Sequence, residues 1–456
     1  MQHSQGIASS SSPPTRAHPG WWQLLTLAIY QLVFSIGFLF YTPVLAWRML
    51  FDRRYCKGLS ERTGRVAFAH ADRDVIWIHG VSIGEIKAAA NIIACLRRLR
   101  PELQLVLSST TPNGHLVARK ENPDLPVVFY PLDFAGFPAR ALDRVRPRCV
   151  LLMELEIWPN FLLAAARRGI PVAVINGRIS QRTFRGYRLA RVLLPQLDLI
   201  SIYCVQDAAY RQRLIDLGID PRRVHVTGNM KYDSVVMGAH AERREELRRW
   251  LAVDDRPVLV AGSTHADEEQ WVVAAVDAAA ATLGRPVRVV LVPRHPERAA
   301  GVSDVVVGCG HQVVRWSTLS ARLPVLGDGT VLLVDTIGQL QQFYSACDVA
   351  FVGGSLVHHG GQNMLEPAAQ GRAVLFGPHT ENFRADVDLL LNAGAAIQVR
   401  DRVDLAHKLR ELLDSPGRRE TIGRLARQVI TENQGATGRT LDLVAPLLGQ
   451  ARSGSG

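Results

Sequence analysis

Two acidic stretches carry the side chains best suited to acid–base chemistry. Glu85 stands in SIGE, directly after the apolar run DVIWIHG, and a serine followed three residues later by a glutamate is typical of a helix capping box. Glu154 and Glu156 alternate in MELEIWPN, so a regular strand would turn them to opposite faces. An acidic pair in an apolar strand is costly to bury without partners, which favours a functional role. Glu85, at the positive end of a predicted helix, is a candidate general base, and helix capping alone is the alternative.

Two basic residues stand near the ends of further apolar runs. Lys231 lies in GNMKYD between Asn229 and Asp233, and a surface lysine in a loop is the alternative interpretation. Arg294 and His295 follow RVVLVP, at the end of a predicted strand. A guanidinium in that position can bind a phosphate through two parallel hydrogen bonds. His295 by itself is more typical of an ordinary loop histidine.

Residues 348–378 combine a strand, a glycine-rich loop and a helix start. DVAFVGG predicts a strand that ends in Gly353 and Gly354, and NMLEPAAQ has helical apolar spacing directly after a second glycine pair. Glycines let backbone N–H groups approach a ligand, and the first turn of a helix leaves unpaired donors at its positive end. The stretch therefore predicts a phosphate site. AVLFGP follows, so the two strands should lie parallel in one sheet, whose carboxyl edge binds ligands.

Alternating strand and helix patterns predict an α/β protein with two similar halves. The predicted strands are DVIWIHG, QLVLSSTT, PVVFYP, VLLMELEIWPN, PVAVING and LISIYCV in the first half, and RPVLVAGST, RVVLVPRHP, VLLVDT, DVAFVGG and AVLFGP in the second. The pattern starts afresh after the charged segment AERREELRRWL. We expect an N-terminal Rossmann-like domain over residues 51–234, a linker and helix over 235–256, and a C-terminal Rossmann-like domain with closing helices over 257–450.

The N-terminal segment predicts a membrane anchor. Residues 1–20 are rich in Ser, Pro and His, which is typical of a disordered tail. Residues 21–47 contain no Lys, Arg, Asp or Glu, and this run exceeds the roughly 20 residues that a membrane helix needs. Aromatic residues stand near its ends, and basic residues follow it: Arg48, Arg53, Arg54 and Lys57. We predict a transmembrane anchor over residues 21–50 with a cytoplasmic main body; a helix lying in the membrane interface is the alternative.

The charge balance suits an anionic partner without choosing one. The formal net charge is +11, which fits nucleic acid, anionic lipid or a phosphorylated substrate. No basic platform rich in aromatic residues supports nucleic acid. The six cysteines are scattered with no CxxC or Cys/His cluster, which predicts reduced thiols and no metal site. Arginines recur about every third residue after position 181, and indicate either a solvated helix face or a site for lipid headgroups: Arg182, Arg185, Arg188 and Arg191.

Taken in order, a series of short motifs is similar to those of one enzyme family. The motifs are KGLSERTGR, WIHGVSIGE, ELEIWPN, NGRIS, GNMKYD, AGSTHADEE, VPRHPER and GGSLVHHGGQNMLEPAAQGRAVLFGPHTENF. They resemble the 3-deoxy-D-manno-octulosonic acid (Kdo) transferases, GT-B glycosyltransferases that attach Kdo to the lipid A precursor in Gram-negative bacteria. The resemblance runs from about Arg53 to the last helices and implies two Rossmann-like domains facing a central cleft, preceded by one transmembrane helix.

The resemblance also implies roles for particular residues. The catalytic base is Glu85, the second acid is Glu154 or Glu156, and the functional lysine is Lys231. The CMP part of the donor is held by residues of the C-terminal domain: Ser263, Pro293, Arg294, Ile337, Gly338, Gln339, Gly353, Gly354, Asn363, Met364, Leu365 and Glu366. The acceptor or lipid phosphate is assigned to Arg178, Arg182 and Arg185. One departure is Gln339, because the family turn often reads IGEL and this chain has IGQL; if the acid binds the nucleotide, the assignment there weakens.

The expected reaction is an inverting transfer of Kdo from CMP-Kdo to the lipid A precursor at the cytoplasmic face of the inner membrane. The expected partners are therefore CMP-Kdo, the lipid A precursor and inner-membrane lipid, with no nucleic acid. A single phosphate can be neutralised by Arg294, Lys231 and a helix N-terminus, so neither a metal nor another cofactor is expected. The alternatives are another GT-B enzyme that uses a UDP-sugar on a lipid-linked acceptor or epimerises a UDP-sugar, and a membrane-tethered nucleotide-binding protein without activity.

Overall fold

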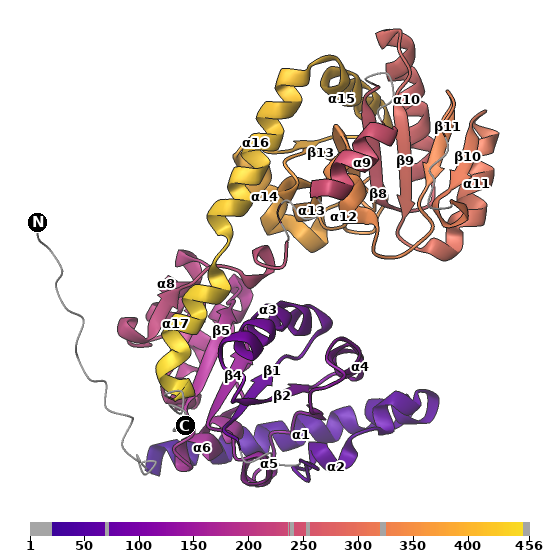
Figure 1. Cartoon of the computed structure of the whole chain (residues 1–456). Coiled ribbons are helices and arrows are strands. Elements are labelled where there is room, and N and C mark those ends of the chain that lie inside the picture. Colours follow the sequence, from indigo (N-terminus) through magenta and orange to yellow (C-terminus); the bar gives the residue numbers. More distant parts are fainter. Residues whose placement is uncertain are drawn as a thin grey trace, which may run out of the picture. The chain divides into compact units, whose positions relative to one another are not determined.

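The computed structural model describes residues 21–68, 73–235, 237, 241–251, 256–319 and 325–449. The contacts divide the chain into two compact units, Met1–Ser234 with Gly435–Gly456, and Val235–Gln434 (Figure 1). Each unit contains one parallel sheet of seven strands. The expected disordered tail over residues 1–20 lies outside the described residues.

The first unit is built on a sheet with strand order β3-β2-β1-β4-β5-β6-β7. The central strand β1 pairs in parallel with β2 and with β4, and all five of its residues are buried. Buried parallel strands read as continuous apolar runs, which is why DVIWIHG predicts β1. The strands are β1 Val75–His79, β2 Gln104–Ser109, β3 Val127–Phe129, β4 Cys149–Met153, β5 Val172–Gly177, β6 Ile202–Val205 and β7 Val224–Val226.

The helices of this unit connect its strands and close its ends. The α-helices are α1 Trp21–Phe51, α2 Leu59–Arg62, α3 Ile83–Leu99, α4 Pro112–Glu121, α5 Phe137–Val145, α6 Pro159–Arg167, α7 Gln181–Ala190, α8 Ala208–Asp216 and α17 Ala436–Leu448. Short 3-10 helices are η1 Arg53–Cys56, η2 Arg191–Leu193, η3 Pro195–Leu199, η4 Pro221–Arg223 and η5 Met230–Tyr232.

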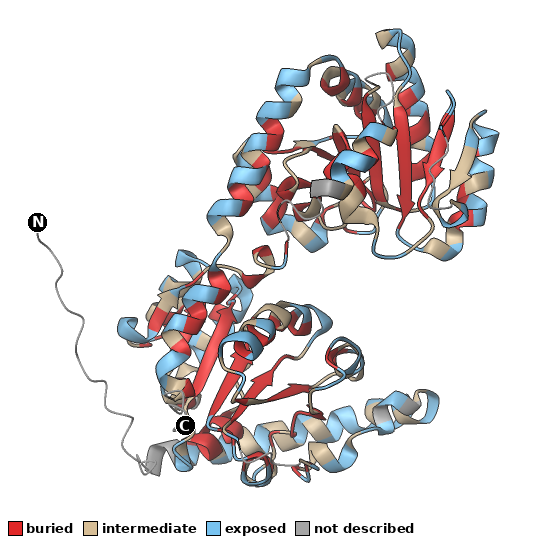
Figure 2. Cartoon of the chain, in the orientation of Figure 1, coloured by how far each residue is buried: buried red, intermediate tan, exposed pale blue. Residues whose placement is uncertain are grey.

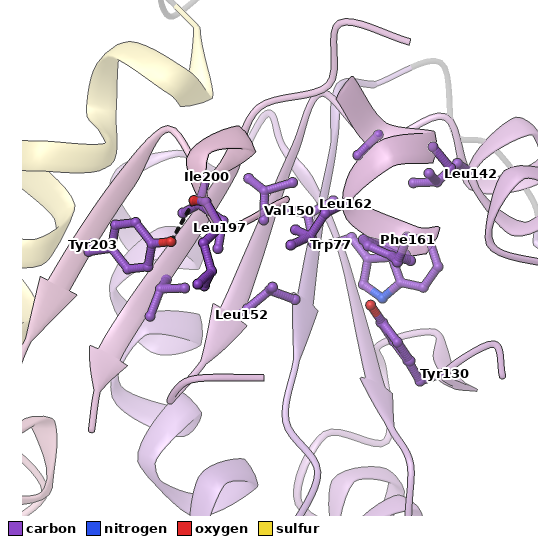
Figure 3. Close-up of a cluster of buried hydrophobic side chains, with 14 of the residues drawn as sticks. Trp77, Tyr130, Leu142, Val150, Leu152, Phe161, Leu162, Leu197, Ile200 and Tyr203 are labelled. Carbon is purple, nitrogen blue, oxygen red and sulfur yellow. Dashed lines mark hydrogen bonds between the residues drawn. The ribbon is translucent and has the colours of Figure 1, made fainter. Parts of the chain in front are cut away.

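Alternate residues of the strands feed two apolar clusters, one on each face of the sheet. Val75 and Trp77 join the cluster that contains α6, whereas Ile76 and Ile78 join the cluster that contains α3 and α17. In the first cluster the Trp77 ring lies edge-on to Phe161 with centroids 5.6 Å apart (Figure 3). The buried strands stand out between more exposed helices in Figure 2. Successive side chains of a strand point to opposite faces of the sheet, so a sheet that is covered on both faces needs apolar residues at every position.

The second unit repeats the architecture with strand order β10-β11-β9-β8-β12-β13-β14. Its strands are β8 Val258–Thr264, β9 Arg288–Pro293, β10 Gln312–Arg315, β11 Thr330–Leu333, β12 Val349–Val352, β13 Ala373–Phe376 and β14 Ile397–Gln398. Its helices are α9 Ala241–Leu251, α10 Glu268–Leu283, α11 Ala299–Gly308, α12 Leu340–Ala346, α13 Leu365–Ala369, α14 Arg384–Asn392, α15 Arg402–Asp414 and α16 Pro416–Asn433, with the 3-10 helices η7 Pro296–Arg298, η8 Trp316–Thr318 and η9 Glu381–Phe383. β12 and β13 pair in parallel, which confirms the strand–loop–helix–strand prediction for residues 348–378.

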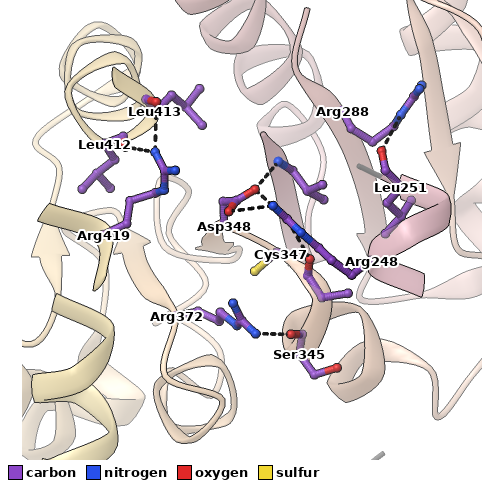
Figure 4. A network of polar contacts seen from close by, with 12 residues as sticks. Arg248, Leu251, Arg288, Ser345, Cys347, Asp348, Arg372, Leu412, Leu413 and Arg419 are labelled. Carbon is purple, nitrogen blue, oxygen red and sulfur yellow. Dashed lines mark hydrogen bonds and ion pairs between the residues drawn. The ribbon is translucent and has the colours of Figure 1, made fainter. Parts of the chain in front are cut away.

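A polar network fixes α9 to the start of the central strands of this unit (Figure 4). The Asp348 carboxylate accepts hydrogen bonds from Arg248 Nη1 at 2.6 Å and from the Val258 backbone N–H at 2.8 Å. Arg248 also donates to the carbonyl of Ala346. One half-buried carboxylate thus joins the charged segment AERREELRRWL to the beginnings of both β8 and β12.

The C-terminal boundary differs from the expectation. We expected the C-terminal domain to extend over residues 257–450, whereas α17 belongs with the first unit. The reason is its apolar face, because Ala436, Leu441, Val444 and Leu448 complete the cluster beneath α3. The turn before α17 is held by Asp233, whose carboxylate accepts the N–H groups of Gly435 and Thr437, each at 2.6 Å.

Helix α1 is a long apolar helix that lies against the first unit. Residues Leu25–Phe51 are long and apolar enough to cross a membrane by length and composition, and most of their side chains are not buried, unlike those of a core helix. Part of α1 is nevertheless held by polar groups. Tyr30 Oη donates to Asp133 at 2.9 Å, and Gln31 Oε1 accepts from the Asn160 side chain at 2.9 Å.

Candidate active site

Glu85 occupies the third position of α3, and its carboxylate is fully engaged in a capping box. Its Oε2 accepts the Val81 N–H at 2.8 Å, and its Oε1 accepts the Ser82 N–H at 3.2 Å and the Ser82 hydroxyl at 2.7 Å. Ser82 Oγ in turn accepts the Glu85 N–H at 3.3 Å, and the side chain of Glu85 is buried. The cap that the SIGE spacing predicts is therefore present. It also holds the carboxylate in one orientation, as a general base requires.

Glu154 and Glu156 both face Glu85, because the strand before them ends early. β4 ends at Met153, and Glu154 adopts a left-handed conformation with a φ of 56°. A non-glycine residue in that region is strained, and such strain gathers at functional sites. The alternation of a regular strand does not apply to this pair. The left-handed turn instead allows both carboxylates to approach the start of α3.

The charge of Glu85 acts on both Glu154 and Glu156. Burial raises the pKa of Glu154, the charge of Glu85 raises it further, and Arg178 and Lys231 lower it. Burial, followed by the charges of Glu85 and Glu154, raises the pKa of Glu156 to about 7. Glu156 is therefore partly protonated at neutral pH. The cluster can therefore hold a proton on one member while another acts as a base.

The loop that carries Lys231 is positioned by asparagine side chains. Asn176 Oδ1 accepts the Met230 N–H at 3.0 Å, and Asn229 Oδ1 accepts the Lys231 N–H at 3.0 Å. Asn176 is buried and has a φ of 53°, so it is a second left-handed residue at the carboxyl edge of this sheet. The sequence interpretation missed Asn176 as a positioning residue. The dipeptide Asn176–Gly177 was the available signal, since asparagine tolerates this conformation.

The predicted phosphate loop of the second unit is occupied from within the chain. Glu268, which is completely buried, accepts the N–H groups of Gly354 at 2.6 Å and of Ser355 and Leu356 at 3.0 Å each. It also accepts the His265 N–H at 2.9 Å. The anion at this glycine loop is thus a protein carboxylate.

Packing between two strands by itself explains why residue 353 is a glycine. A Cβ at this position would lie 2.5 Å from the carbonyl oxygen of Ser263. The glycine therefore lets β12 end beside β8, whether or not a ligand approaches it. Donor contacts at Gly353 and Gly354 stay a prediction.

Ser263 and Arg294 both lie at the carboxyl edge of the second sheet. Ser263 is left-handed with a φ of 57°, and the Arg294 N–H donates to the carbonyl of Thr264, the residue after Ser263, at 3.0 Å. Pro293 ends β9, and the Arg294 side chain is exposed beyond it. These residues lie where parallel sheets bind ligands.

The other predicted donor residues lie in two helix starts. Asn363 lies in the turn before α13, where its Oδ1 accepts the Leu365 N–H at 3.1 Å and its Nδ2 donates to Glu366 at 3.0 Å. Met364 and Leu365 are buried, so only their backbone could meet a ligand. In the turn before α12, Ile337 is 86% exposed, Gly338 has a φ of 88°, and Gln339 bonds to Gln342.

The arginines proposed for the acceptor are exposed in the first unit. Arg178 follows β5 and acts electrostatically on Glu154. Arg182 and Arg185 lie on α7. Tyr187 is on the same helix, and its pKa is raised to about 12, first by burial and then by the charge of Glu156. Helix α7 therefore borders the carboxylate cluster. Arg191, from the same stripe, has a structural role, since it bonds both oxygens of Asp198 at 2.9 Å.

The two Rossmann-like units, together with solved structures of the same architecture, identify the class of protein. A UDP-GlcNAc 2-epimerase from Neisseria meningitidis, solved with bound UDP-GlcNAc, matches with a TM-score of 0.52 at 14% identity, over 82% of this chain and 100% of that chain. MurG from Acinetobacter baumannii matches with a TM-score of 0.50 at 15% identity, over 82% of this chain and 99% of that chain. The chain therefore has the GT-B fold.

Sequence comparisons identify the family within that class. The domain family described as 3-deoxy-D-manno-octulosonic-acid transferase (kdotransferase) matches residues 57–234. A 3-deoxy-D-manno-octulosonic acid transferase of Haemophilus influenzae is 34% identical over 87% of this chain and 92% of its own length. The enzyme of the same name from Bordetella pertussis is 34% identical over 82% of this chain and 87% of its own length. The chain belongs to the Kdo transferase family and is a glycosyltransferase, which confirms the resemblance in its motifs.

Proposed function

We propose that this Kdo transferase takes Kdo from CMP-Kdo and attaches it to the lipid A precursor at the cytoplasmic face of the inner membrane, without a metal. The observation that carries the proposal is the cluster of Glu85, Glu154 and Glu156 beside Lys231 and Arg178. This cluster combines an oriented carboxylate, a group that holds a proton near neutral pH, and cations that suit an anionic acceptor. Membership of the family supports the choice of sugar.

In the proposed reaction Glu85 removes a proton from a hydroxyl group of the acceptor. The hydroxyl oxygen attacks the anomeric carbon of Kdo, the bond from that carbon to the phosphate oxygen breaks, and CMP leaves with the electron pair. One displacement inverts the configuration. Arg294, Ser263 and the turn at Asn363 would hold the CMP, whose single phosphate needs less neutralisation than a diphosphate. Glu154 and Glu156 would set the charge around Glu85, and Lys231 would balance it.

Helix α1 supports the proposed location. The segment Leu25–Phe51 has the length and composition of a membrane span, and four basic residues follow or end it: Arg48, Arg53, Arg54 and Lys57. Basic residues beside a span favour the cytoplasmic side. A catalytic unit attached to such a helix would remain beside a lipid acceptor in the bilayer.

The test is Kdo transfer by the detergent-solubilised full chain. CMP-Kdo prepared beforehand and freed of metal is supplied with tetraacylated lipid A precursor in EDTA, and the products are counted by mass. We compare the wild type with Glu85→Ala and with Glu85→Gln, which keeps an acceptor oxygen for the Ser82 cap. Transfer by the wild type, with none by the variants, supports CMP-Kdo as the donor, the lipid A precursor as the acceptor and Glu85 as the base. Because EDTA is present, it also supports a reaction without a metal. No transfer by folded wild type would reject the proposed substrates, and full activity of both variants would leave Glu85 as a helix cap only.

A further inference from the structure

Five histidines gather in the loops that follow the strands of the second sheet. His265 follows β8, His295 follows β9, His358 and His359 follow β12, and His379 follows β13. The chain has 14 histidines in all, so about a third stand at the one edge of this sheet where ligands bind. His295, His358 and His359 are exposed and His265 and His379 are half-buried, so all five side chains are accessible at this edge.

The ring of His265 contacts two of the other rings. The rings of His265 and His359 are stacked, with centroids 4.2 Å apart and planes inclined by 21°. The ring of His295 stands at 83° to that of His265, with centroids 6.0 Å apart. Gln362 Nε2 lies 3.4 Å from His265 Nε2. The cluster is thus a small surface of imidazole nitrogens beside Ser263 and Arg294, the predicted donor residues.

The charges around His265 are mostly positive. Burial is the main cause that lowers the pKa of His265 to about 4, and the charges of four neighbours contribute to the same shift: His359, His295, Arg298 and Arg294. Two nearby acids interact with other groups: Glu268 accepts hydrogen bonds from the loop N–H groups, and Glu269 forms an ion pair with Arg298 at 2.9 Å. An exposed acid, Glu297, lies 3.3 Å from His295 Nδ1. Asp267 is also exposed. The site therefore has several potential cations and few acids facing them, and a bound anion would favour protonated imidazoles.

A metal ion is a poor explanation for this cluster. Among the described residues, no group of three or more His, Cys, Asp and Glu side chains could hold a metal ion. Stacked rings present their faces to each other, whereas metal ligands direct their nitrogens to one point. An anion accepts hydrogen bonds from separate rings without such convergence.

We propose that His265, His295 and His359 form a subsite that binds the carboxylate of the donor's sugar acid, next to the subsite of its phosphate. This inference rests on the proposed function, because CMP-Kdo is the donor it requires. Kdo is an octulosonic acid, so its carboxylate is bonded to the same anomeric carbon as the phosphate oxygen. The donor therefore brings two anionic groups within a few bonds of each other. Arg294 suits the phosphate, and the adjacent imidazoles supply a second anion site that a neutral hexose would not fill.

The subsite would make the enzyme selective for an acidic sugar. Burial and the neighbouring cations lower the pKa of His265, so the empty site avoids the cost of several fixed charges in a small space. When the carboxylate enters, it favours the protonated form of the rings that it contacts, and charge-assisted hydrogen bonds form. A UDP-hexose has no group that would stabilise the protonated form. Donor binding should consequently weaken as the pH rises above the range in which imidazoles protonate.

The experiment measures two constants on the full-length enzyme. KM for CMP-Kdo reports the complete donor, and the inhibition constant of CMP reports a ligand with the phosphate but without the sugar carboxylate. The variants are His265→Asn and His359→Asn; the exposed His359 keeps the test valid if the half-buried His265 proves necessary for folding. The control is His407→Asn, on α15, where the ring pairs with Glu411 at 3.1 Å.

We expect each cluster variant to raise KM for CMP-Kdo by about tenfold or more, the value of one charge-assisted hydrogen bond, with the inhibition constant of CMP unchanged within about twofold. The wild-type KM should rise between pH 6 and 8.5, and this rise should flatten in the variants. Equal weakening of CMP and CMP-Kdo would overturn the proposal and assign the rings to the phosphate. An active wild type with unchanged KM in both variants would overturn the subsite alone. A folded wild type that transfers no Kdo would reject the proposed function, and the subsite with it.

Discussion

Replacing Glu156 by glutamine should stabilise the first unit at alkaline pH while damaging its site. Glu156 is half-buried, and its carboxyl faces the charges of Glu85 and Glu154, so its ionised form is disfavoured. Glutamine has nearly the same shape and carries no charge at any pH. The substitution therefore removes a repulsion and leaves the packing around Trp158 in place.

The pH dependence of this gain follows from the two pKa values. The pKa of Glu156 rises from 4.5, the value expected for an unfolded chain, to about 7 in the folded protein. Between these values the folded state binds more protons than the unfolded state, so stability falls as the pH rises from 4.5 to 7. Above pH 7 the loss is complete and amounts to at most about 3 kcal/mol for such a difference in pKa. Glu156→Gln should recover up to that amount at pH 8 and almost nothing near pH 4.5.

Thermal and urea unfolding of the full chain at pH 5, 6, 7 and 8 would check this expectation. Hydrogen exchange in peptides covering β1 and β4 assigns the change to the first unit, which is necessary because two units need not unfold together. Glu121→Gln, at the exposed end of α4, controls for the loss of a surface carboxylate. A gain that is the same at every pH, or a variant less stable than the wild type at pH 8, would refute the electrostatic explanation.

Three further predictions concern the polar contacts of the scaffold. Glu268→Gln should destabilise the second unit by about 2 kcal/mol, because an amide brings donor groups against the N–H of Gly354 and its neighbours; urea unfolding and exchange in the loop peptide would show it. Asp348→Ala should cost about 3 kcal/mol by leaving Arg248 without its carboxylate, and urea unfolding that matches the wild type would contradict the role of this network. Tyr30→Phe should loosen α1 by about 1 kcal/mol, seen as faster exchange of the Asp133 segment with α7 unaffected.

The architecture could be predicted from the sequence because its physical cause is local. A strand covered by helices on both faces has to be apolar at consecutive positions, as in β1 and β4, and the glycine-rich turn between β12 and α13 follows directly from chain geometry. The placement of α17 was not accessible in this way. Its apolar stripe would suit either unit, and only the packing against α3 decides between them.

The site was harder to predict because its decisive contacts join distant residues. The glycine loop has the pattern of an anion site, and a carboxylate of the chain accepts its N–H groups. The pattern could not reveal that this carboxylate belongs to Glu268, which is 86 residues away from Gly354. Similarly, the prediction that Glu154 and Glu156 point to opposite faces assumes that β4 continues through both residues. The residues MELEIWPN do not indicate that the strand ends at Met153.

Backbone strain gathers at the carboxyl ends of both sheets, and the acidic cluster lies at that end of the first sheet. Five described residues that are not glycine have a positive φ: Glu154, Asn176, Ser263 and Asp267 lie within or after β4, β5 and β8, and Arg146 precedes β4. Each such conformation costs about 1 kcal/mol or more, and the acidic cluster adds the cost of crowded carboxylates. A sheet edge selected only for stability would avoid both. The apolar strands beneath these edges are buried on both faces, and they supply the stability that keeps such strained side chains in place. We therefore expect substrate binding and catalysis at the carboxyl edge of the sheet in each unit, where the unfavourable conformations lie.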